Sequence, residues 1–172
     1  MIMDLTGFFD NGEASKTVEG EIDFNKIDFP ELEVDIVNPI KFNGIIYKLS
    51  DYYALDLKIN YKSRTECNRC LEALEQDVDT QLFGKLVNSH VESQNDLEEF
   101  EEFIHMEKDR LDLKKHVLEQ VISSIPMKSL CDNECKGLCQ NCGVDLNIQT
   151  CDCDNNIIDP RFEKLKKFFP EK

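Results

Sequence analysis

Eight cysteines are the residues of this 172-residue chain best suited to chemistry, and they occur in close pairs. Two thiols separated by two or three residues can both reach one ion from a tight turn, and a glycine such as Gly143 suits that turn because it tolerates positive φ. Four thiolates at tetrahedral corners are ligands that zinc prefers. The sequence therefore predicts a structural zinc site. The pairs are Cys67 and Cys70, Cys131 and Cys135, Cys139 and Cys142, and Cys151 and Cys153.

The spacing leaves the ligand set open. Six of the cysteines lie within residues 131–153, and we expect four of these six to bind one zinc. Cys139 and Cys142 are favoured as one half of the site, and the other half is either the 131/135 pair or the 151/153 pair. Eight cysteines also permit two four-sulfur sites, in which Cys67 and Cys70 join one of the C-terminal pairs. The remaining alternative for Cys67 and Cys70 is a turn with two free thiols.

Other cysteine chemistries fit the sequence less well. A thioredoxin-like centre needs C-x-x-C at a helix N-terminus in a βαβ setting, which neither motif has. The spacing matches neither common ferredoxin pattern for iron–sulfur ligation. A catalytic zinc normally keeps an open position and often uses histidine, but His90, His105 and His116 lie outside the cysteine cluster. We therefore predict no catalytic residues and no enzymatic activity.

Composition and termini favour a cytoplasmic protein with an acidic surface. The net charge is −15, which argues against a phosphate-tracking surface over the whole molecule and favours a basic partner or plain solvation. The N-terminal stretch resembles neither a signal peptide nor a transit peptide, and no window approaches a membrane helix. In the cytosol thiols stay reduced, so the cysteines indicate metal binding rather than disulfides.

The elements that must position the cysteines begin with strands. Residues 55–62 alternate strictly between apolar and polar side chains, as in a half-buried antiparallel strand. Weaker alternation occurs at 17–24, 31–37 and 74–87, and Asn43-Gly44 is a hairpin signal. The motif CNRC then lies at a hairpin tip, between strands 55–66 and 74–87.

Helical and charged segments follow. Residues 109–125 carry an apolar stripe at four-residue spacing, with Asp109 or Asp112 as the cap and Pro126 as the stop. The window 92–112 holds nine acidic residues against Lys108 and Arg110, which predicts a solvated loop, a frayed helix or a docking surface for a basic protein. A short basic helix is predicted from Asp159. Its cations, which are candidates for contact with RNA or an acidic partner, are Arg161, Lys164, Lys166 and Lys167.

Together these patterns predict an α+β fold. It comprises an antiparallel curved sheet or small open barrel, one packed helix, and a C-terminal cysteine-rich zinc knuckle. The expected organisation is an antiparallel strand domain (1–88), an acidic linker (89–108), a helix packing on the sheet (109–130), and a cysteine-rich zinc extension with the short basic helix (131–172).

Five stretches occurring in this order resemble the YceD family, the large ribosomal RNA subunit accumulation proteins. The resemblance spans about residues 67–168, and the N-terminal third matches only in its strand-rich character. The stretches are CNRCLE (67–72), VISSIPMKSLC (121–131), CKGLCQNCGVDLN (135–147), CDC (151–153) and DPRFEKLKKF (159–168).

The resemblance implies a role in large-subunit biogenesis, supporting 23S ribosomal RNA accumulation or processing. It implies a large-subunit ribosomal protein or pre-ribosome as partner and no established enzymatic activity. We expect any RNA or partner contact of the cations to be confined to Arg69 and residues 161–167. The C-x-R-C block is the family's most widespread feature, whereas the C-terminal cysteine cluster is absent from some branches. Cys67, Arg69 and Cys70 are therefore expected to carry the common role, and 131–153 to stabilise a branch-specific extension. The alternatives are a zinc-dependent RNA-processing enzyme and a structural or metal-handling zinc module.

Overall fold

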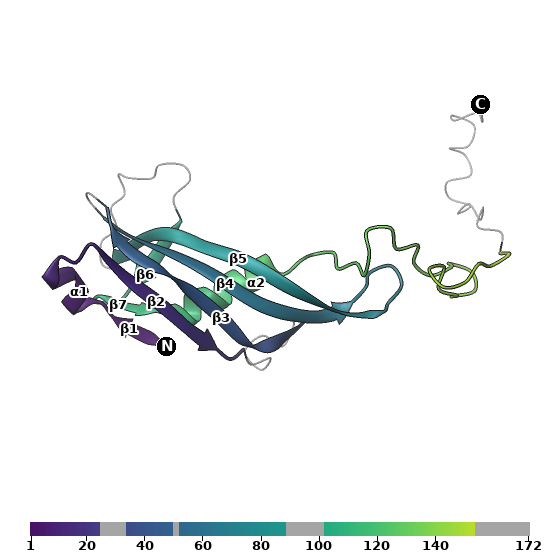
Figure 1. Cartoon of the computed structure of the whole chain (residues 1–172), viewed down its shortest axis with the longest axis horizontal. Coiled ribbons are helices and arrows are strands. Elements are labelled where there is room, and N and C mark those ends of the chain that lie inside the picture. The colour runs from purple at the N-terminus through teal and green to yellow at the C-terminus, as the bar shows by residue number, and fades with distance from the viewer. Residues whose placement is uncertain (25–33, 50–51, 89–101, 154–172) are drawn as a thin grey trace, which may run out of the picture. The chain divides into compact units, whose positions relative to one another are not determined.

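The structure, a computed structural model, describes residues 1–24, 34–49, 52–88 and 102–153 (Figure 1). The chain divides into two compact units. The first unit comprises residues 1–65 and 73–127, and the second comprises residues 66–72 and 128–172. The sheets and helices lie in the first unit, whereas all eight cysteines belong to the second.

A curved, open five-stranded sheet forms most of the first unit (Figure 1). The strand order is β2-β3-β4-β5-β6, so that β2 and β6 form its edges. β3 pairs antiparallel with both β2 and β4. A two-stranded antiparallel sheet joins β1 and β7. The strands are β1 (Ile2–Asp4), β2 (Ser15–Ile22), β3 (Asp35–Lys48), β4 (Tyr53–Glu66), β5 (Ala73–Asn88), β6 (Phe103–Met106) and β7 (Arg110–Asp112).

The alternation at 55–62 correctly predicted which face of β4 is buried. Leu55, Leu57 and Ile59 are fully buried, while Lys58 and Lys62 of the opposite face are exposed. This buried face continues across the sheet and meets the apolar side of helix α2 (Leu113–Ser124) in one core. The core residues of α2 are Leu113, Val117, Leu118 and Val121.

The helix begins at Leu113, the first residue of its apolar stripe, four residues later than the start of the predicted range 109–125. Lys108 and Asp109 have positive φ and form a tight turn, closed by hydrogen bonds between the backbones of Glu107 and Arg110. Residues 110–112 then pair with β1, so the chain is extended there. Asp112 caps the helix by accepting a hydrogen bond from the backbone N–H of Lys115, at 3.4 Å. The capping residue was therefore one of the two predicted.

The expectation of one packed helix was wrong, because a second helix, α1 (Thr6–Asn11), follows β1. Its first turn is anchored by the N–H of Thr6, which donates to Asp4 Oδ1 at 2.9 Å. It ends at Gly12 in a left-handed conformation, and Phe8 is buried in the core. A helix of six residues is too short for apolar periodicity to reveal it.

The hairpin predicted at Asn43-Gly44 was also wrong. These residues lie inside β3, where Gly44 is opposite Val18 of β2 and Leu57 of β4. A Cβ on Gly44 would overlap the carbonyl oxygen of Asp56. The glycine therefore serves a close approach of two backbones within the sheet rather than a turn.

The sheet is not wholly antiparallel, since β6 pairs parallel with β5. A parallel pair needs a long connection, and residues 89–102 supply one. β6 and β7 both lie within the acidic window 92–112 that suggested a loop or frayed helix. The described residues exclude residues 92–101 of that window, residues 25–33, and the predicted basic helix from Asp159.

Candidate metal centre

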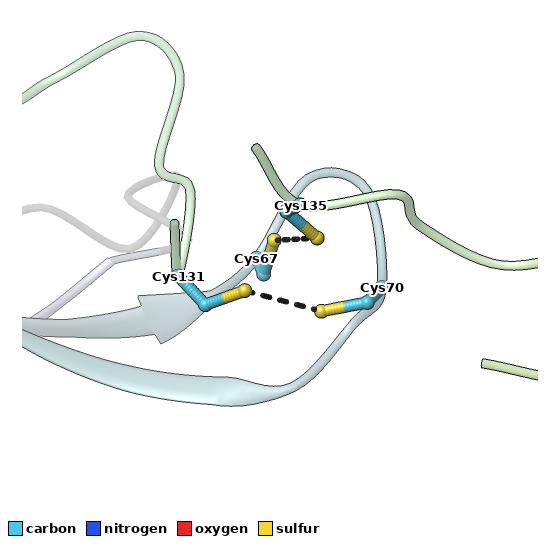
Figure 2. A group of neighbouring side chains, drawn as sticks. All are labelled: Cys67, Cys70, Cys131 and Cys135. Atoms are coloured by element: carbon cyan, nitrogen blue, oxygen red, sulfur yellow. Dashed lines mark hydrogen bonds between the residues drawn. The ribbon is translucent and has the colours of Figure 1, made fainter. Parts of the chain in front are cut away.

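The eight cysteines gather into two groups of four within the second unit. In each group the four sulfur atoms all lie within 4.8 Å of one another. The first cysteine cluster comprises Cys67, Cys70, Cys131 and Cys135 (Figure 2). The second cysteine cluster comprises Cys139, Cys142, Cys151 and Cys153.

The geometry of the first cysteine cluster fits a tetrahedral metal ion. Cys67 Sγ lies 3.9 Å from Cys135 Sγ, and Cys70 Sγ lies 3.5 Å from Cys131 Sγ (Figure 2). A regular tetrahedron with metal–sulfur distances of about 2.3 Å has sulfur–sulfur edges of roughly 3.8 Å. A disulfide would require about 2.05 Å. Both clusters could therefore hold a metal ion, and none of the eight cysteines is in a disulfide.

Both C-x-x-C motifs fold into the same tight turn. In the first, the N–H of Leu71 donates to the carbonyl of Cys67 at 2.9 Å, and the N–H of Cys67 donates to the carbonyl of Glu72 at 2.8 Å. In the second, the N–H of Gly143 donates to the carbonyl of Cys139 at 2.9 Å, and the N–H of Cys139 donates to the carbonyl of Val144 at 2.8 Å. The residue after the second cysteine has positive φ in both turns, 62° at Leu71 and 73° at Gly143.

Arg69 connects the two halves of the first cysteine cluster. Its Nη1 donates to the backbone carbonyls of Asn133 at 3.0 Å and Cys135 at 2.8 Å. Its own carbonyl accepts from the N–H of Leu138 at 3.1 Å. Arg69 thus holds the loop that carries Cys135 against the turn that carries Cys67. Contact of Arg69 with RNA or a partner stays a prediction.

Gly137 makes this approach of backbones possible. Its φ is 73°, and a Cβ there would lie 2.9 Å from the Arg69 carbonyl oxygen. The carbonyl of Gly137 also accepts from the N–H of Leu146 at 2.9 Å, so one residue contacts segments near both clusters. Gly137 therefore meets two requirements, the left-handed backbone and the missing side chain.

Asn147 is a site residue that the sequence interpretation missed. Its Nδ2 donates to Cys135 Sγ at 3.3 Å, and its Oδ1 accepts from the N–H of Lys136 at 2.7 Å. A donor directed at a sulfur that could bind a metal ion is typical of the groups that orient metal ligands. Asn147 lies 12 residues from Cys135 in sequence, and no local pattern marks such a pairing.

In each cluster the surroundings lower the pKa of one cysteine thiol and raise the pKa of at least one other. Backbone N–H groups of Cys131 and Cys70 lower the pKa of Cys67 to about 6. Those of Cys142 and Asn141 lower the pKa of Cys139 to about 6. The neighbouring Cys142 sulfur and burial raise the pKa of Cys153 to about 12. The crowded sulfurs of Cys135 and Cys70 likewise raise the pKa of Cys131.

These opposing shifts have one physical cause. Four thiols at contact distance cannot all ionise, because the negative charges repel. A divalent cation between them removes that conflict and allows all four to bind as thiolates. The donor set and its crowding therefore suit a soft or borderline metal ion with tetrahedral preference.

The structure brings together some of the predicted residues. Cys139 and Cys142 lie with Cys151 and Cys153, one of the two groupings considered, while Cys131 and Cys135 lie with Cys67 and Cys70. The predicted cationic contacts Arg161, Lys164, Lys166 and Lys167 lie outside the described residues. Among the helices that the structure describes, none is long and apolar enough to cross a membrane.

Two relatives resemble parts of this chain. One is the chloroplastic large ribosomal RNA subunit accumulation protein YCED homolog 1 of Arabidopsis thaliana, 30% identical over 129 residues covering 60% of this chain. The other is an uncharacterized protein of Mycobacterium leprae (strain TN), 28% identical over 127 residues covering 74% of this chain. The matches span 38% and 58% of those relatives. No solved structure matches this chain significantly.

A family model provides the identification. The model of the large ribosomal RNA subunit accumulation protein YceD matches residues 55–169. This range begins in β4 and contains every cysteine of both clusters. The chain therefore belongs to the YceD family, as its five sequence stretches indicated.

Proposed function

We propose that this protein is a non-enzymatic factor in biogenesis of the large ribosomal subunit, which supports 23S rRNA accumulation by binding a basic ribosomal protein or the pre-ribosome. The observation that carries this proposal is the YceD match over residues 55–169. The Arabidopsis relative is named for accumulation of large ribosomal RNA. The net charge of −15 favours a basic protein over bare RNA as the main contact.

The second part of the proposal is that each cysteine cluster binds one structural zinc ion. Four sulfurs within 4.8 Å supply a complete tetrahedral set, which leaves no open position for substrate or water. Zinc is preferred to an iron–sulfur cluster because the sulfur–sulfur distances of 3.9 Å and 3.5 Å in the first cysteine cluster suit a single ion, and the cysteine spacing matches neither common ferredoxin pattern. A closed coordination shell supports a role in folding rather than in catalysis.

Elemental analysis tests the zinc assignment. Protein prepared under reducing, anaerobic conditions should contain about two zinc ions per chain, one for each tetrahedral set. Cys67→Ser and Cys139→Ser should each remove roughly one ion and leave the other in place. Zinc below one per chain, or iron in its place, would contradict the assignment.

Affinity capture tests the assembly role. The tagged chain should recover large-subunit ribosomal proteins or pre-ribosomes, and the protein component should persist after nuclease treatment. A wild-type chain that recovers only bare RNA would contradict binding through a ribosomal protein. Charge reversal at Glu98, Glu99, Glu101 and Glu102 examines the acidic window separately, and undiminished binding would remove that segment from the interface.

An RNA-cleavage assay separates this proposal from a zinc-dependent processing enzyme. Purified, zinc-loaded protein incubated with precursor 23S RNA should leave the RNA intact. Metal-dependent cleavage that is lost with Cys67→Ser would instead establish the enzymatic alternative.

A further inference from the structure

Leu71 occupies a backbone conformation that leucine rarely adopts. Its φ is 62°, in the left-handed region where the Cβ of a bulky residue meets the following carbonyl. The conformation is imposed by the turn, because the N–H of Leu71 must bond the Cys67 carbonyl while the next residue bonds the Cys67 N–H.

The second C-x-x-C turn has glycine at the position that corresponds to Leu71. It has the same two backbone hydrogen bonds, and its equivalent residue is Gly143 at φ 73°. Nothing lies within 4 Å of a Cβ built on Gly143, so the glycine serves the backbone conformation rather than close packing. One chain thus holds a relaxed and a strained version of one turn.

Burial does not compensate the strain at Leu71. Its side chain is 60% exposed, and it is not part of the hydrophobic core of the described residues. Glu72 follows Leu71 directly, and Glu66 precedes Cys67, whose N–H donates to the Glu72 carbonyl, so the two glutamates flank the turn; both are exposed. Arg69, the nearby cation, donates to the carbonyls of Asn133 and Cys135. The turn therefore presents an exposed apolar side chain, with one carboxylate next to it in sequence and a second at the start of the turn.

We infer that Leu71 is the apolar anchor of a docking surface for a basic protein segment, with Glu66 and Glu72 as its charged rim. Strained residues whose conformation is imposed by the surrounding structure are concentrated at functional sites. An apolar anchor within a charged rim is the usual anatomy of a protein interface. Carboxylates beside the anchor repel phosphates, so the occupant is a cationic polypeptide rather than RNA.

This inference rests on the proposed function, since it names the part of the chain that meets the basic ribosomal partner. It assigns the role to an exposed side chain of the first C-x-x-C turn, and it leaves the cysteines to metal binding. Leu71→Gly should have opposite effects on stability and on binding. Glycine should suit the backbone conformation of the turn better than leucine does, but it has no side chain for the partner to contact.

The test uses the full-length, zinc-loaded chain and four variants. Leu71→Gly removes the anchor and relaxes the turn, whereas Leu71→Met retains an apolar side chain. Glu72→Lys reverses one rim charge. Ile148→Ser is the matched control, because Ile148 is also exposed (79%) in the same unit but lies outside the turn. The probes are salt-extracted large-subunit ribosomal proteins and, separately, protein-free 23S RNA.

Wild type, Leu71→Met and Ile148→Ser should bind the ribosomal protein fraction equally. Leu71→Gly and Glu72→Lys should each weaken that binding, Leu71→Gly by about tenfold or more. Zinc content should be unchanged, and the unfolding temperature of Leu71→Gly should equal or exceed that of wild type.

Two results would contradict the assignment of Leu71 as the anchor. One is undiminished binding by Leu71→Gly, and the other is a lower unfolding temperature, which would show that Leu71 packs within the chain. If the wild-type chain binds the RNA probe in preference to the ribosomal protein fraction, then RNA, and not a basic polypeptide, occupies this surface. If wild type binds neither probe, the proposed function itself fails, which is distinguishable from failure at Leu71 alone.

Discussion

Gly137 and Gly143 show how two glycines in one metal-binding unit carry different constraints. Both have φ of 73°, so both occupy the left-handed region that disfavours alanine. Only Gly137 also lies against another backbone, at the Arg69 carbonyl. The turn requirement and the packing requirement can therefore be separated by matched substitutions.

We expect Gly143→Ala to cost about 1–2 kcal/mol, the strain of a left-handed non-glycine residue. Gly137→Ala should cost more, because its Cβ would also lie 2.9 Å from the Arg69 carbonyl oxygen. The measurement is zinc retention against a competing chelator, in which 1.4 kcal/mol corresponds to about tenfold in affinity. Equal losses in the two variants would show that the Arg69 contact does not constrain the cluster.

At the scale of elements, Tyr61 links strand β4 to helix α2. Its hydroxyl donates to the carbonyl of Val121 at 3.2 Å and lies 3.0 Å from Ser124 Oγ. Its ring is buried in the core, with 4% exposure. The polar end of this side chain therefore joins the sheet to the last turn of the helix.

Tyr61→Phe should lower the free energy of unfolding by about 1 kcal/mol at neutral pH. The loss is modest because Ser124 Oγ also donates to the Val121 carbonyl, which keeps a partner. Urea denaturation of the zinc-loaded chain, followed by circular dichroism, measures it. An unchanged transition would show that the two hydrogen bonds add no net stability.

Tyr61 also makes the folding stability depend on pH, in a direction that its pKa shift predicts. Burial raises the pKa of Tyr61 above its ordinary value near 10. Above pH 10 the folded state therefore holds this proton more tightly than the unfolded state, and stability falls as pH rises through that window. The advantage of wild type over Tyr61→Phe should be constant below pH 10 and shrink above it. An advantage that grows in alkali would contradict the raised pKa.

Gly44 tests the observed register of β3. Gly44→Ala should destabilise the first unit by about 1–3 kcal/mol, because the added methyl group overlaps the Asp56 carbonyl of β4. Gly7→Ala is the control within α1, where a Cβ meets nothing within 4 Å, and it should stabilise by up to about 1 kcal/mol. Thermal unfolding distinguishes them. A neutral Gly44→Ala would contradict the close approach of β3 and β4 at this position.

At the scale of the whole molecule, the two units depend on different interactions. The first unit has a continuous apolar core, whereas the buried apolar side chains in the described part of the second unit, residues 66–72 and 128–153, are its cysteines. A small unit without a core of its own usually needs a metal or disulfides to fold. Zinc binding can supply on the order of 10 kcal/mol of apparent folding free energy at neutral pH.

Chelation should therefore unfold the second unit selectively. Amides in residues 66–72 and 128–153 should lose protection from hydrogen exchange, while those of β2 to β5 and α2 stay protected. Hydrogen exchange with mass spectrometry measures both regions in one experiment, and restored zinc should restore protection. Simultaneous loss of protection throughout the chain would show that the units do not fold separately.

Local patterns in the sequence were sufficient to predict several features of the fold. The period of two in residues 55–62 identified the buried face of β4, and the apolar stripe, with Asp109 or Asp112 as the possible cap, identified helix α2. The loop that carries Cys67 and Cys70 was placed between its two strands because both flanking runs alternate. These features depend on neighbours within a few residues, which is the range over which sequence period and capping act.

Which cysteine pairs share a cluster was decided only by the tertiary structure. The sequence determined the four pairs and the chemistry they suit, because each turn is local. The grouping depends on where the chain returns: Cys67 and Cys135 are 68 residues apart, and Arg69, Gly137 and Asn147 bring the relevant loops together. Spacing cannot encode that approach, because it results from backbone contacts between segments that are remote in sequence.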